Sequence, residues 1–520
     1  MANNVAVIGI FSVLLVTAVV GVTHLKNNGD SKSGEISSST KAEIRKVLAN
    51  SATIQDLNKD DNNKAALKVC KEVLDLSIAD LQLSFDKLGG YEMSKIGDYI
   101  LNLRVWLSGA LTTLQTCVDS YAEVNNEQAE KMNSILKTSI ELTQNSLTMV
   151  TKLSTILNGL NISGLNIGTT GFERKLLSND GPEWMGHAER RLLQAKPTDL
   201  KPNDGSGKYD TITKALAEVP PKRPNRFIIH IKASTYKEQV LLPKEMTNVM
   251  LIGDGPTKTI ITNDLNCIRD HPLKTFGTAT VGVDGAGFMA RDIGFENTAG
   301  PPGHQAVAFR ATCDMVIMFN CHFNGYQDTL YAHKQKQFYR DCLISGTVDF
   351  IFGDAASIFQ NCLIIARKPG ENQNNMITAH GRKFPYTHSA IVLQNCTISG
   401  APDYLPVKDK SKTYLGRPWK ALARTIIMQS NIDDIITPEG VSQGYSPMQG
   451  TVGIDTGYFV EFQNRGPGSK TEGRVKWPSI KTIDINEAKK WTPGVFLETE
   501  TDKWISQTGT PCYPDMVPRV

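Results

Sequence analysis

The 520-residue sequence lacks several patterns that assign a chain to a familiar class. Its nine cysteines include no CxxC pair, so a zinc site has no support and we expect no metal. It has no arginine-rich stripe with interleaved aromatic residues, and its net charge is only +3. Nucleic acid is therefore not an expected partner.

Long apolar runs are absent as well, except for one near the N-terminus. Residues 5–22 are uncharged and mostly apolar, and their length reaches the lower limit for a membrane span. No basic residue precedes the run and no clear small-x-small cleavage site follows it, so residues 1–25 fit either a signal peptide or a signal anchor. Either alternative sends the rest of the chain into the secretory pathway, the second with a precursor anchored in the Golgi membrane.

The segment 40–158 has the apolar periodicity of helices. Apolar residues recur at helical spacing in three runs, which cover 67–83, 101–114 and 132–158. We therefore predict a small helical bundle, in which Cys70 and Cys117 are natural disulfide partners in an oxidising compartment. The bundle carries no constellation of acids, bases or metal ligands, which indicates a binding or inhibitory module rather than an enzyme.

The next segment, residues 159–199, is rich in Gly, Asn and Ser, as a linker would be. Two basic residues followed by two leucines occur twice in it, beginning at Arg174-Lys175 and at Arg190-Arg191. Dibasic sites in an exposed linker of a secreted protein invite proteolysis, so we predict processing here. Asn161, in Asn-Ile-Ser, is the predicted glycosylation site.

A short pattern recurs in the remainder of the chain. An aromatic, aliphatic or polar residue stands before Asn or Asp, and Cys or Thr follows, with the Asn/Asp positions at 297, 320, 341, 361 and 395. Repeats of this length are too short to bury their own face, which implies stacked units that share one core. Their β-branched and aromatic runs favour strands. We predict an all-β right-handed parallel β-helix from about residue 200 to 465, with a β-sandwich as the alternative.

Four cysteines occupy the same place in this repeat: Cys321, Cys342, Cys362 and Cys396. In an oxidising compartment several cysteines should pair, so we predict that neighbours in this set are bridged across the rungs of the coil. The total number of cysteines is odd, which leaves at least one thiol among Cys267, Cys313 and Cys512.

Two aspartates have a spacing that matches the repeat. Asp328 in GYQDTL and Asp349 in GTVDFIFG are 21 residues apart, so a coil that turns once per twenty-odd residues stacks them on neighbouring rungs. Paired strands lie about 4.8 Å apart, which brings the two carboxylates to one site. Paired carboxylates at that range can divide the roles of nucleophile and general acid.

Four other side chains suit the same chemistry. Gln305 lies 22 residues before Gln327, and side-chain amides at neighbouring rungs can donate hydrogen bonds to an oxyanion. Arg417 in YLGRPW can hold a carboxylate with two hydrogen bonds and keep it ionised, and Trp419 can stack on a sugar ring. Thr275 in KTFGTAT is a further candidate for a substrate contact.

These residues lie in segments that closely resemble plant pectin methylesterases: HQAVAFR, GYQDTLYAH, QFYRDC, GTVDFIFGDAA, NMITAHGR, YLGRPWK and RGPGS. The resemblance extends over residues 200–520. Around KVCKEVLDLSIADL and LSGALTTLQTCVDS the first part is similar to the pectin methylesterase inhibitor family. The order of helical module, dibasic linker and β-helix resembles the precursor form of these enzymes.

The resemblance implies a role for each candidate residue. Asp349 corresponds to the nucleophile that attacks the methyl-ester carbonyl of a galacturonate unit, and Asp328 to the general acid and base. Gln305 and Gln327 would stabilise the oxyanion, and Arg417 would orient Asp349. Substrate contacts would come from Thr275, Gln305, Arg417, Trp419, Tyr331 and Phe352.

The resemblance also implies partners and surroundings. The substrate would be methyl-esterified homogalacturonan, with no metal or organic cofactor. The chain's own inhibitor-like pro-domain and a subtilisin-like processing protease would be its protein partners. The mature enzyme would be a monomer secreted to the cell wall.

Several alternatives remain open on the sequence alone. Asp349 could activate a water molecule instead of attacking the ester itself. A polygalacturonase would share the β-helix, but the chain has no Gly-His-Gly signal of that class. A catalytically silent pectin-binding relative would be expected to have lost Asp328, Asp349 or Arg417, and all three are present. The helical module could assist folding instead of inhibiting.

Overall fold

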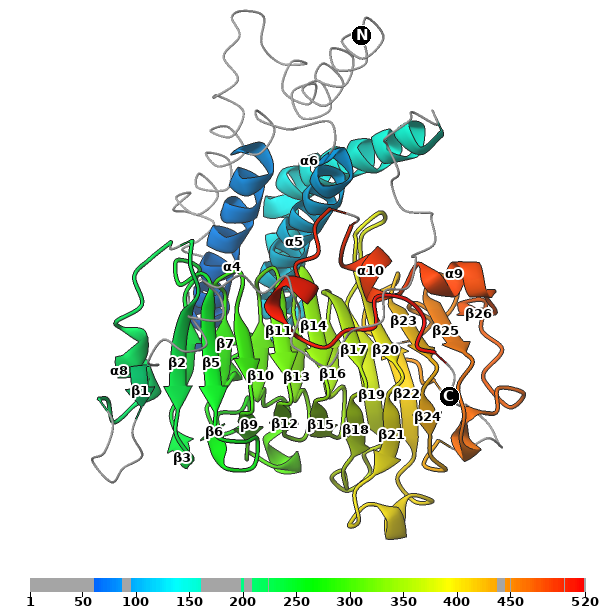
Figure 1. The fold of residues 1–520 in the computed structure, drawn as a ribbon. Coiled ribbons are helices and arrows are strands. Elements are labelled where there is room, and N and C mark those ends of the chain that lie inside the picture. Colours follow the sequence, from blue (N-terminus) through cyan, green and yellow to red (C-terminus); the bar gives the residue numbers. More distant parts are fainter. Residues whose placement is uncertain are drawn as a thin grey trace, which may run out of the picture. The chain divides into compact units, whose positions relative to one another are not determined.

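The computed structural model of the chain describes residues 60–86, 95–159, 198–200, 208–222, 224–436, 445–448, 450–499 and 501–518. The predicted leader, the two dibasic sites and Asn161 lie outside these residues. Within the described part of the chain, no helix is long and apolar enough to cross a membrane. The chain divides into two compact units, one helical and one built of strands (Figure 1).

The described part of the helical unit consists of α4 (Asp61–Asp86), α5 (Ile96–Ala122) and α6 (Asn126–Gly159). Helix α5 packs against both α4 and α6 and is buried along most of its length. The hydroxyl of Ser77 on α4 donates to the carbonyl of Ala110 on α5 at 3.3 Å. A disulfide joins Cys70 to Cys117, which confirms the predicted pair. The predicted helical bundle is thereby confirmed.

The second unit is a coil of three parallel sheets. Among the described residues, sheet A has eleven strands, sheet B eight and sheet C seven, and every paired strand is parallel to its neighbour. From Phe227 to Pro418 each turn of the coil contributes one strand to each sheet, which is the right-handed parallel β-helix predicted from the repeat (Figure 1). The strands extend to Lys481, so the coil is longer than the predicted end near residue 465.

The strands have the following bounds. Sheet A contains β1 (Thr198–Leu200), β2 (Phe227–Ile231), β5 (Val249–Gly253), β8 (Met289–Arg291), β11 (Val316–Phe319), β14 (Lys336–Arg340), β17 (Ala356–Gln360), β20 (Ala390–Gln394), β23 (Arg424–Met428), β25 (Tyr458–Phe462) and β26 (Ile480–Lys481). Sheet B contains β3 (Ser234–Lys237), β6 (Thr259–Asn263), β9 (Gly294–Asn297), β12 (His322–Asn324), β15 (Leu343–Gly346), β18 (Leu363–Ala366), β21 (Thr397–Gly400) and β24 (Asn431–Ile432). Sheet C contains β4 (Val240–Leu242), β7 (Val281–Val283), β10 (Phe309–Ala311), β13 (Leu330–Ala332), β16 (Ile351–Gly353), β19 (Asn375–His380) and β22 (Thr413–Pro418).

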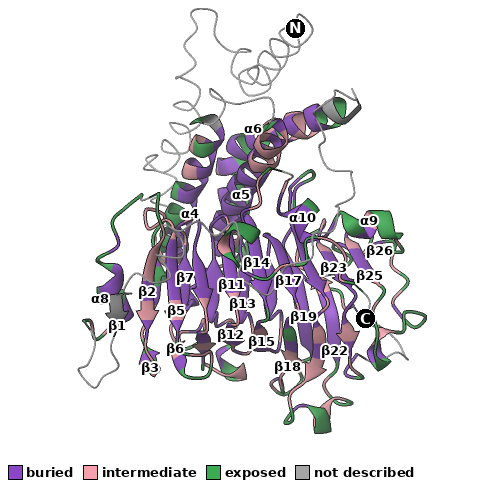
Figure 2. Ribbon diagram, in the orientation of Figure 1, coloured by how far each residue is buried: buried purple, intermediate pink, exposed green. Residues whose placement is uncertain are grey.

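The short helix α8 (Ile212–Leu216) belongs to the first turn of the coil. The outer face of sheet A is covered by the C-terminal part of the chain, which includes α9 (Ile485–Lys489) and α10 (Pro493–Phe496). Trp491, Phe496 and Trp504 pack on the outward apolar residues of the strands. The central strands β14, β17 and β20 are therefore buried along their whole length, and Figure 2 draws β14 and β17 in purple.

The recurring Asn/Asp residues sit where the chain bends from sheet A into sheet B. Asn320, Asp341, Asn361 and Asn395 all have positive φ angles, between 48° and 58°. Asn and Asp tolerate this left-handed conformation better than other non-glycine residues, which explains why the repeat uses them. The side chains also form hydrogen bonds between neighbouring rungs, as where Asn395 Nδ2 donates to Asn361 Oδ1 at 2.8 Å.

One member of the predicted repeat is wrong. The sheet register pairs Phe319 with Arg291, so the residue that matches Asn320 on the preceding rung is Asp292, with φ of 59°. Asn297 is instead the last residue of β9, and its side-chain amide donates to the backbone carbonyl of Leu265. The similarity of Asn297 and Thr298 to the repeat is a coincidence of composition.

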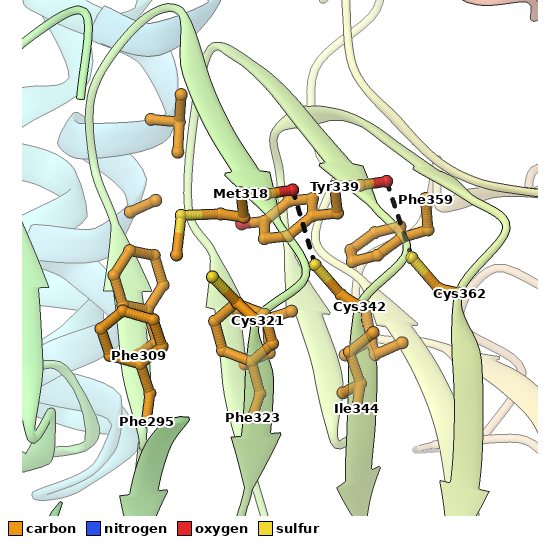
Figure 3. Close-up of a cluster of buried hydrophobic side chains, with 14 of the residues drawn as sticks. Phe295, Phe309, Met318, Cys321, Phe323, Tyr339, Cys342, Ile344, Phe359 and Cys362 are labelled. Atoms are coloured by element: carbon orange, nitrogen blue, oxygen red, sulfur yellow. Dashed lines mark hydrogen bonds between the residues drawn. The ribbon is translucent and has the colours of Figure 1, made fainter. Parts of the chain in front are cut away.

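The predicted disulfides across the rungs are also wrong. Register places Cys321, Cys342, Cys362 and Cys396 side by side on neighbouring rungs, yet all four are free thiols. Parallel stacking points the four side chains in the same direction at the strand spacing of about 4.8 Å, wider than the Cβ separation of a disulfide. Each of the last three thiols contacts a carbonyl of the preceding rung, as for Cys342 and Met318 at 3.5 Å (Figure 3).

The thiol ladder is part of the aromatic core. Tyr339 and Phe359 stack with ring centroids 4.4 Å apart, and Phe295 stacks on Phe323 at 5.4 Å (Figure 3). Burial raises the pKa of the Cys342 thiol well above its ordinary value, which keeps it protonated.

We expect alkylation of the unreduced, denatured chain to label seven cysteines, because Cys70 and Cys117 form the disulfide among the described residues. Intact-mass measurement after alkylation with and without reductant gives the number directly. A native, folded sample should react far less, since Cys313 and the four ladder thiols are buried. Labelling of three or five cysteines in the unreduced, denatured chain would show that the ladder thiols are bridged.

Candidate active site

The candidate site lies on the outer face of sheet C. Phe309, Leu330 and Ile351 on β10, β13 and β16 belong to the core cluster inside the coil. The residue that follows each of them points the other way, because side chains alternate along a strand. Register aligns these outward residues across the sheet in the order Arg310, Tyr331, Phe352, Ala379, Arg417. This line is called the outward row below.

Asp328 and Asp349 lie in the turns that precede β13 and β16. Both adopt the left-handed conformation, with φ of 65° and 51°. The backbone N–H of Asp328 donates to the carbonyl of Val348 at 2.9 Å, and that of Leu330 donates to Phe350 at 2.9 Å. The two turns are therefore stacked in register on neighbouring rungs, as the spacing of 21 residues predicts.

Asp349 is bound by Arg417 from β22. The guanidinium donates from Nε to Oδ1 at 2.7 Å and from Nη2 to Oδ2 at 2.6 Å. Burial raises the pKa of Asp349 above its ordinary value, while the charge and the two hydrogen bonds of Arg417 oppose that rise. A bidentate pair of this kind fixes the orientation of the carboxylate.

The pKa of Arg417 also depends on the second aspartate, Asp328. Burial lowers the pKa of Arg417, but the charge and hydrogen bonds of Asp349, together with the charge of Asp328, raise it above its ordinary value. One cation therefore balances two neighbouring carboxyl groups, which is the arrangement that allows both to remain at one site.

The two glutamines lie next to the aspartates. The carbonyl of Gln327 accepts from the N–H of Ala306 at 3.2 Å, so Gln305 sits one residue before the level of Gln327 on the preceding rung. Both side-chain amides are partly exposed, and neither has a hydrogen-bond partner among the described residues. Their donors are available to a bound ester oxygen.

Thr275 begins the 3-10 helix Thr275–Thr278 beside Gln305. Cys267 connects the two, because its N–H donates to the carbonyl of Gln305 at 3.2 Å and its sulfur lies 3.9 Å from Thr275 Oγ1. Cys267 thus links Thr275 to the backbone of Gln305, while the substrate contact of Thr275 stays a prediction.

Aromatic rings form part of the outward row and flank it. Tyr331 and Phe352 stack with centroids 4.1 Å apart, and Trp419 lies edge-on to Phe352 at 5.9 Å. Trp419 approaches closely because Gly381 has no side chain, and a Cβ there would lie 2.7 Å from the indole ring. Phe276 adds a further edge-on contact to Tyr331 at 6.5 Å.

Phe276 and Arg310 were not among the predicted site residues. The guanidinium carbon of Arg310 lies 3.5 Å from the centroid of the Phe276 ring, within the range of a cation–π contact. Arg310 Nη1 donates to Asp284 at 2.8 Å and to Thr312 at 2.6 Å, so its side chain is fixed. Phe276 directly follows Thr275 in KTFGTAT, and that position is the one signal that could have revealed it.

The arrangement is suited to transfer of an acyl group. A buried carboxylate is oriented by an arginine, a second carboxyl group lies on the neighbouring rung, and two side-chain amides flank them. The carboxylate can attack a carbonyl, the amides can stabilise the resulting oxyanion, and the second carboxyl group can move protons. The neighbouring aromatic rings can pack against a sugar.

Known proteins share both units of the chain. Residues 201–500 match the family described as Pectinesterase, and residues 22–149 match the family described as Plant invertase/pectin methylesterase inhibitor. The Putative pectinesterase/pectinesterase inhibitor 28 of Arabidopsis thaliana is 46% identical over 477 residues, which are 91% of this chain and 63% of that protein. A Pectinesterase of Petunia integrifolia is 48% identical over 391 residues, which are 74% of this chain and 100% of that protein. Among solved structures, the pectin methylesterase from carrot has a TM-score of 0.58 at 44% identity and covers 60% of this chain and 96% of its own.

Proposed function

Because the chain belongs to the pectinesterase family, we propose that it hydrolyses the methyl esters of galacturonate units in cell-wall pectin. The products would be methanol and de-esterified pectate. The observation that carries the proposal is the carboxylate of Asp349, held at both oxygens by Arg417 and stacked one rung from Asp328. A silent pectin-binding relative would be expected to have lost Asp328, Asp349 or Arg417, and all three are present.

Asp349 acts as the nucleophile in the proposed reaction. Its carboxylate oxygen attacks the ester carbonyl, and the oxyanion that forms accepts hydrogen bonds from the amides of Gln305 and Gln327. The carbonyl then re-forms, the bond to the methoxy oxygen breaks, and Asp328 gives that oxygen a proton so that methanol leaves. Asp328, now ionised, takes a proton from water as the water attacks the acyl-enzyme, which releases the galacturonate and regenerates both aspartates.

The helical unit is proposed to restrain or assist the catalytic unit until the linker is cut. This role is supported by the match to the inhibitor family and by the dibasic tetrads between the two units. A subtilisin-like protease of the secretory pathway would make the cut, and the mature monomer would be secreted to the cell wall. Expressing the helical unit in trans while measuring both yield and activity separates the two roles, because an inhibitor lowers activity and a folding helper raises yield.

We expect residues 194–520 to release methanol from methylated pectin. Methanol is measured with alcohol oxidase or by gas chromatography, and pectin without methyl esters is the blank. A well-folded sample that releases no methanol would overturn the esterase proposal. Binding to pectin by that same sample would then favour the silent pectin-binding relative.

A further inference from the structure

Three glutamines lie next to one another along the end of sheet A. Gln360 ends β17 and Gln394 ends β20, and the register places the two side by side. Gln429 follows β23, one residue beyond the partner of Gln394. Their amides are bonded in series, because Gln360 Nε2 donates to Gln394 Oε1 at 2.8 Å and Gln394 Nε2 donates to Gln429 Oε1 at 3.5 Å. These three residues are called the glutamine ladder below.

The glutamine ladder binds the main chain of residues 511–518, which are called the strap below. Gln360 binds both backbone groups of Tyr513, since its Oε1 accepts from the N–H at 2.9 Å and its Nε2 donates to the carbonyl at 2.9 Å. Gln429 binds Val517 in the same way, with both bonds again at 2.9 Å. In Figure 1 the red C-terminal part of the chain passes across the strands of sheet A. The two glutamines therefore hold the strap by its backbone and not by its side chains.

The middle glutamine completes a pattern with a period of two. Gln394 Nε2 donates to the carbonyl of Asp515 at 3.2 Å, so the ladder binds every second residue of the strap. A strand presents its backbone groups to a neighbouring strand at the same period. The ladder therefore takes the place of a neighbouring strand.

The ladder is buried and needs an occupant. Gln360 and Gln394 are 0% exposed, and Gln429 is 7% exposed. A buried amide without a hydrogen-bond partner is unfavourable, and the strap supplies a partner for the Nε2 group of each glutamine. Arg340 fixes the first of them, because its Nη1 donates to Gln360 Oε1 at 2.5 Å. The ladder is therefore preorganised for an extended main chain.

The sequence of the strap favours an extended conformation. Proline occupies positions 511, 514 and 518, where it fixes φ and has no N–H. Tyr513 and Val517, whose N–H groups the ladder binds, both precede a proline, and that position favours extended backbone. The free strap therefore loses less conformational entropy on binding than an ordinary peptide would.

The other contacts of the strap are shallow. Cys512 and Met516 are partly buried against the apolar cluster on the outer face of sheet A, and Tyr513 is 39% exposed. The carbonyl of Pro514 accepts a hydrogen bond from the N–H of Gly494 at 2.8 Å. The strap contributes no residue to the core cluster inside the coil, so it can leave the surface without opening that core.

We propose that the glutamine ladder is a binding site for extended peptide main chain and that the strap is its exchangeable ligand. When the strap is released, the site takes up a peptide of the same sequence from solution. The glutamines lie on three consecutive turns of the coil, and the first and last of these turns also carry Phe352 and Arg417. An occupied ladder therefore ties together turns that build the candidate active site.

The test uses the full-length chain with the recognition sequence of a site-specific protease inserted between Thr510 and Pro511. Pro511 is exposed, so the folded protein can be cut there. The probe is a fluorescent peptide of residues 511–518, present in excess during cutting, and its binding is measured by fluorescence anisotropy. We expect the cut protein to exchange its strap for the probe, and the uncut protein, whose site is filled, to bind none.

Two methylated peptides show whether the ladder binds the main chain. Methylation of the Val517 nitrogen removes the N–H that Gln429 binds, and we expect it to weaken binding roughly ten-fold. Methylation of the Met516 nitrogen is the matched control, because that N–H donates to the side chain of Asp515 within the strap and not to the ladder. Its effect should be smaller, about two- to three-fold.

Gln429→Met provides the matching change in the protein. We expect it to weaken binding of the unmodified peptide roughly ten-fold and to remove the difference between that peptide and the one methylated at Val517. Because the difference is measured within one protein, a general loss of stability does not imitate it. Gln463→Met is the control, since Gln463 adopts nearly the same φ on the next rung, 52° against 54°, and is exposed.

Thermal unfolding gives a second measure of occupancy. A ligand that binds only the folded state stabilises it, so unlabelled peptide should raise the Tm of the cut protein in a concentration-dependent way. A cut protein that keeps its own strap and takes up no probe over days would overturn the exchange. Equal affinities for the unmodified and both methylated peptides would overturn recognition by the ladder and would show that Cys512 and Met516 hold the strap. Neither result bears on the proposed pectinesterase function, which methanol release tests separately.

Discussion

Replacing Asp349 with asparagine is expected to reduce methanol release by roughly 10⁴-fold or more, the range seen when a catalytic nucleophile is removed. Asparagine has nearly the same shape, tolerates the positive φ of 51° and can still accept a hydrogen bond from Arg417. The fold should therefore survive while the attacking oxygen is lost. Initial rates at saturating pectin, with circular dichroism as the check of folding, give the result.

The matched control for this variant is Asp341→Asn. Asp341 also has a positive φ, 52°, and its carboxylate accepts a hydrogen bond from Arg340 at 3.0 Å, but it lies in the bend between sheets A and B. We expect this variant to keep wild-type activity, because asparagine already occupies the same bend on other rungs. Equal losses in both variants would show that the effect comes from the turn and not from catalysis.

A slow Asp328→Asn variant distinguishes attack by Asp349 from activation of water. If Asp349 is the nucleophile, loss of the general base slows the second step, and an acyl-enzyme on Asp349 accumulates. Rapid quenching in acid followed by peptide mass spectrometry should detect a galacturonoyl adduct, joined through its carboxyl carbon, on the peptide that contains Asp349. Repeated absence of the adduct under conditions of measurable turnover would favour activation of water by Asp349.

Sequence reasoning predicts those parts of the β-helix that depend on backbone conformation. Asn320, Asp341, Asn361 and Asn395 recur because each rung needs a residue that accepts positive φ at the same bend. The pairing of Asp328 with Asp349 follows from the length of the same rung. The pattern fails at Asn297, where residue types similar to the repeat occur in a different part of the rung. Register, which only the paired strands reveal, separates the two cases.

The contacts that sequence reasoning misses depend on side-chain direction. Four cysteines at equivalent positions suggest bridges, but parallel stacking gives them one common direction and leaves them as thiols. Phe276 and Arg310 are far apart in sequence and come together because a 3-10 helix folds over the outer face of sheet C. The contact between Phe276 and Arg310 leaves no periodic pattern in the sequence. Arg417 could be predicted because the charge of a buried carboxylate demands a partner.

Replacing Arg417 with methionine is expected to lower kcat by roughly 10²- to 10³-fold and to move the acid limb of the pH profile upward. Burial already raises the pKa of Asp349, and Arg417 is the group that opposes the rise. Without the guanidinium the pKa of Asp349 rises further, so the attacking carboxylate becomes protonated at a higher pH as the medium is acidified. Activity that depends on the ionised form is then lost earlier on the acid side.

A second buried ion pair provides the control. Arg474 donates to both oxygens of Glu461 at 2.7 Å and 2.9 Å, and both side chains are almost fully buried. Removing one partner of such a pair typically costs about 3–5 kcal/mol of stability. Arg474→Met should therefore lower Tm as Arg417→Met does, while its pH profile stays at the wild-type position.

Arg417→Lys completes the set, because lysine keeps the charge but cannot bind both oxygens at once. We expect it to restore most of the acid limb while kcat stays low, since charge sets the pKa of Asp349 and the planar fork sets its orientation. If Arg417→Met and Arg474→Met moved the acid limb equally, the shift would reflect loss of stability alone. An unmoved acid limb in Arg417→Met would mean that Asp349 is not the group whose ionisation limits the reaction.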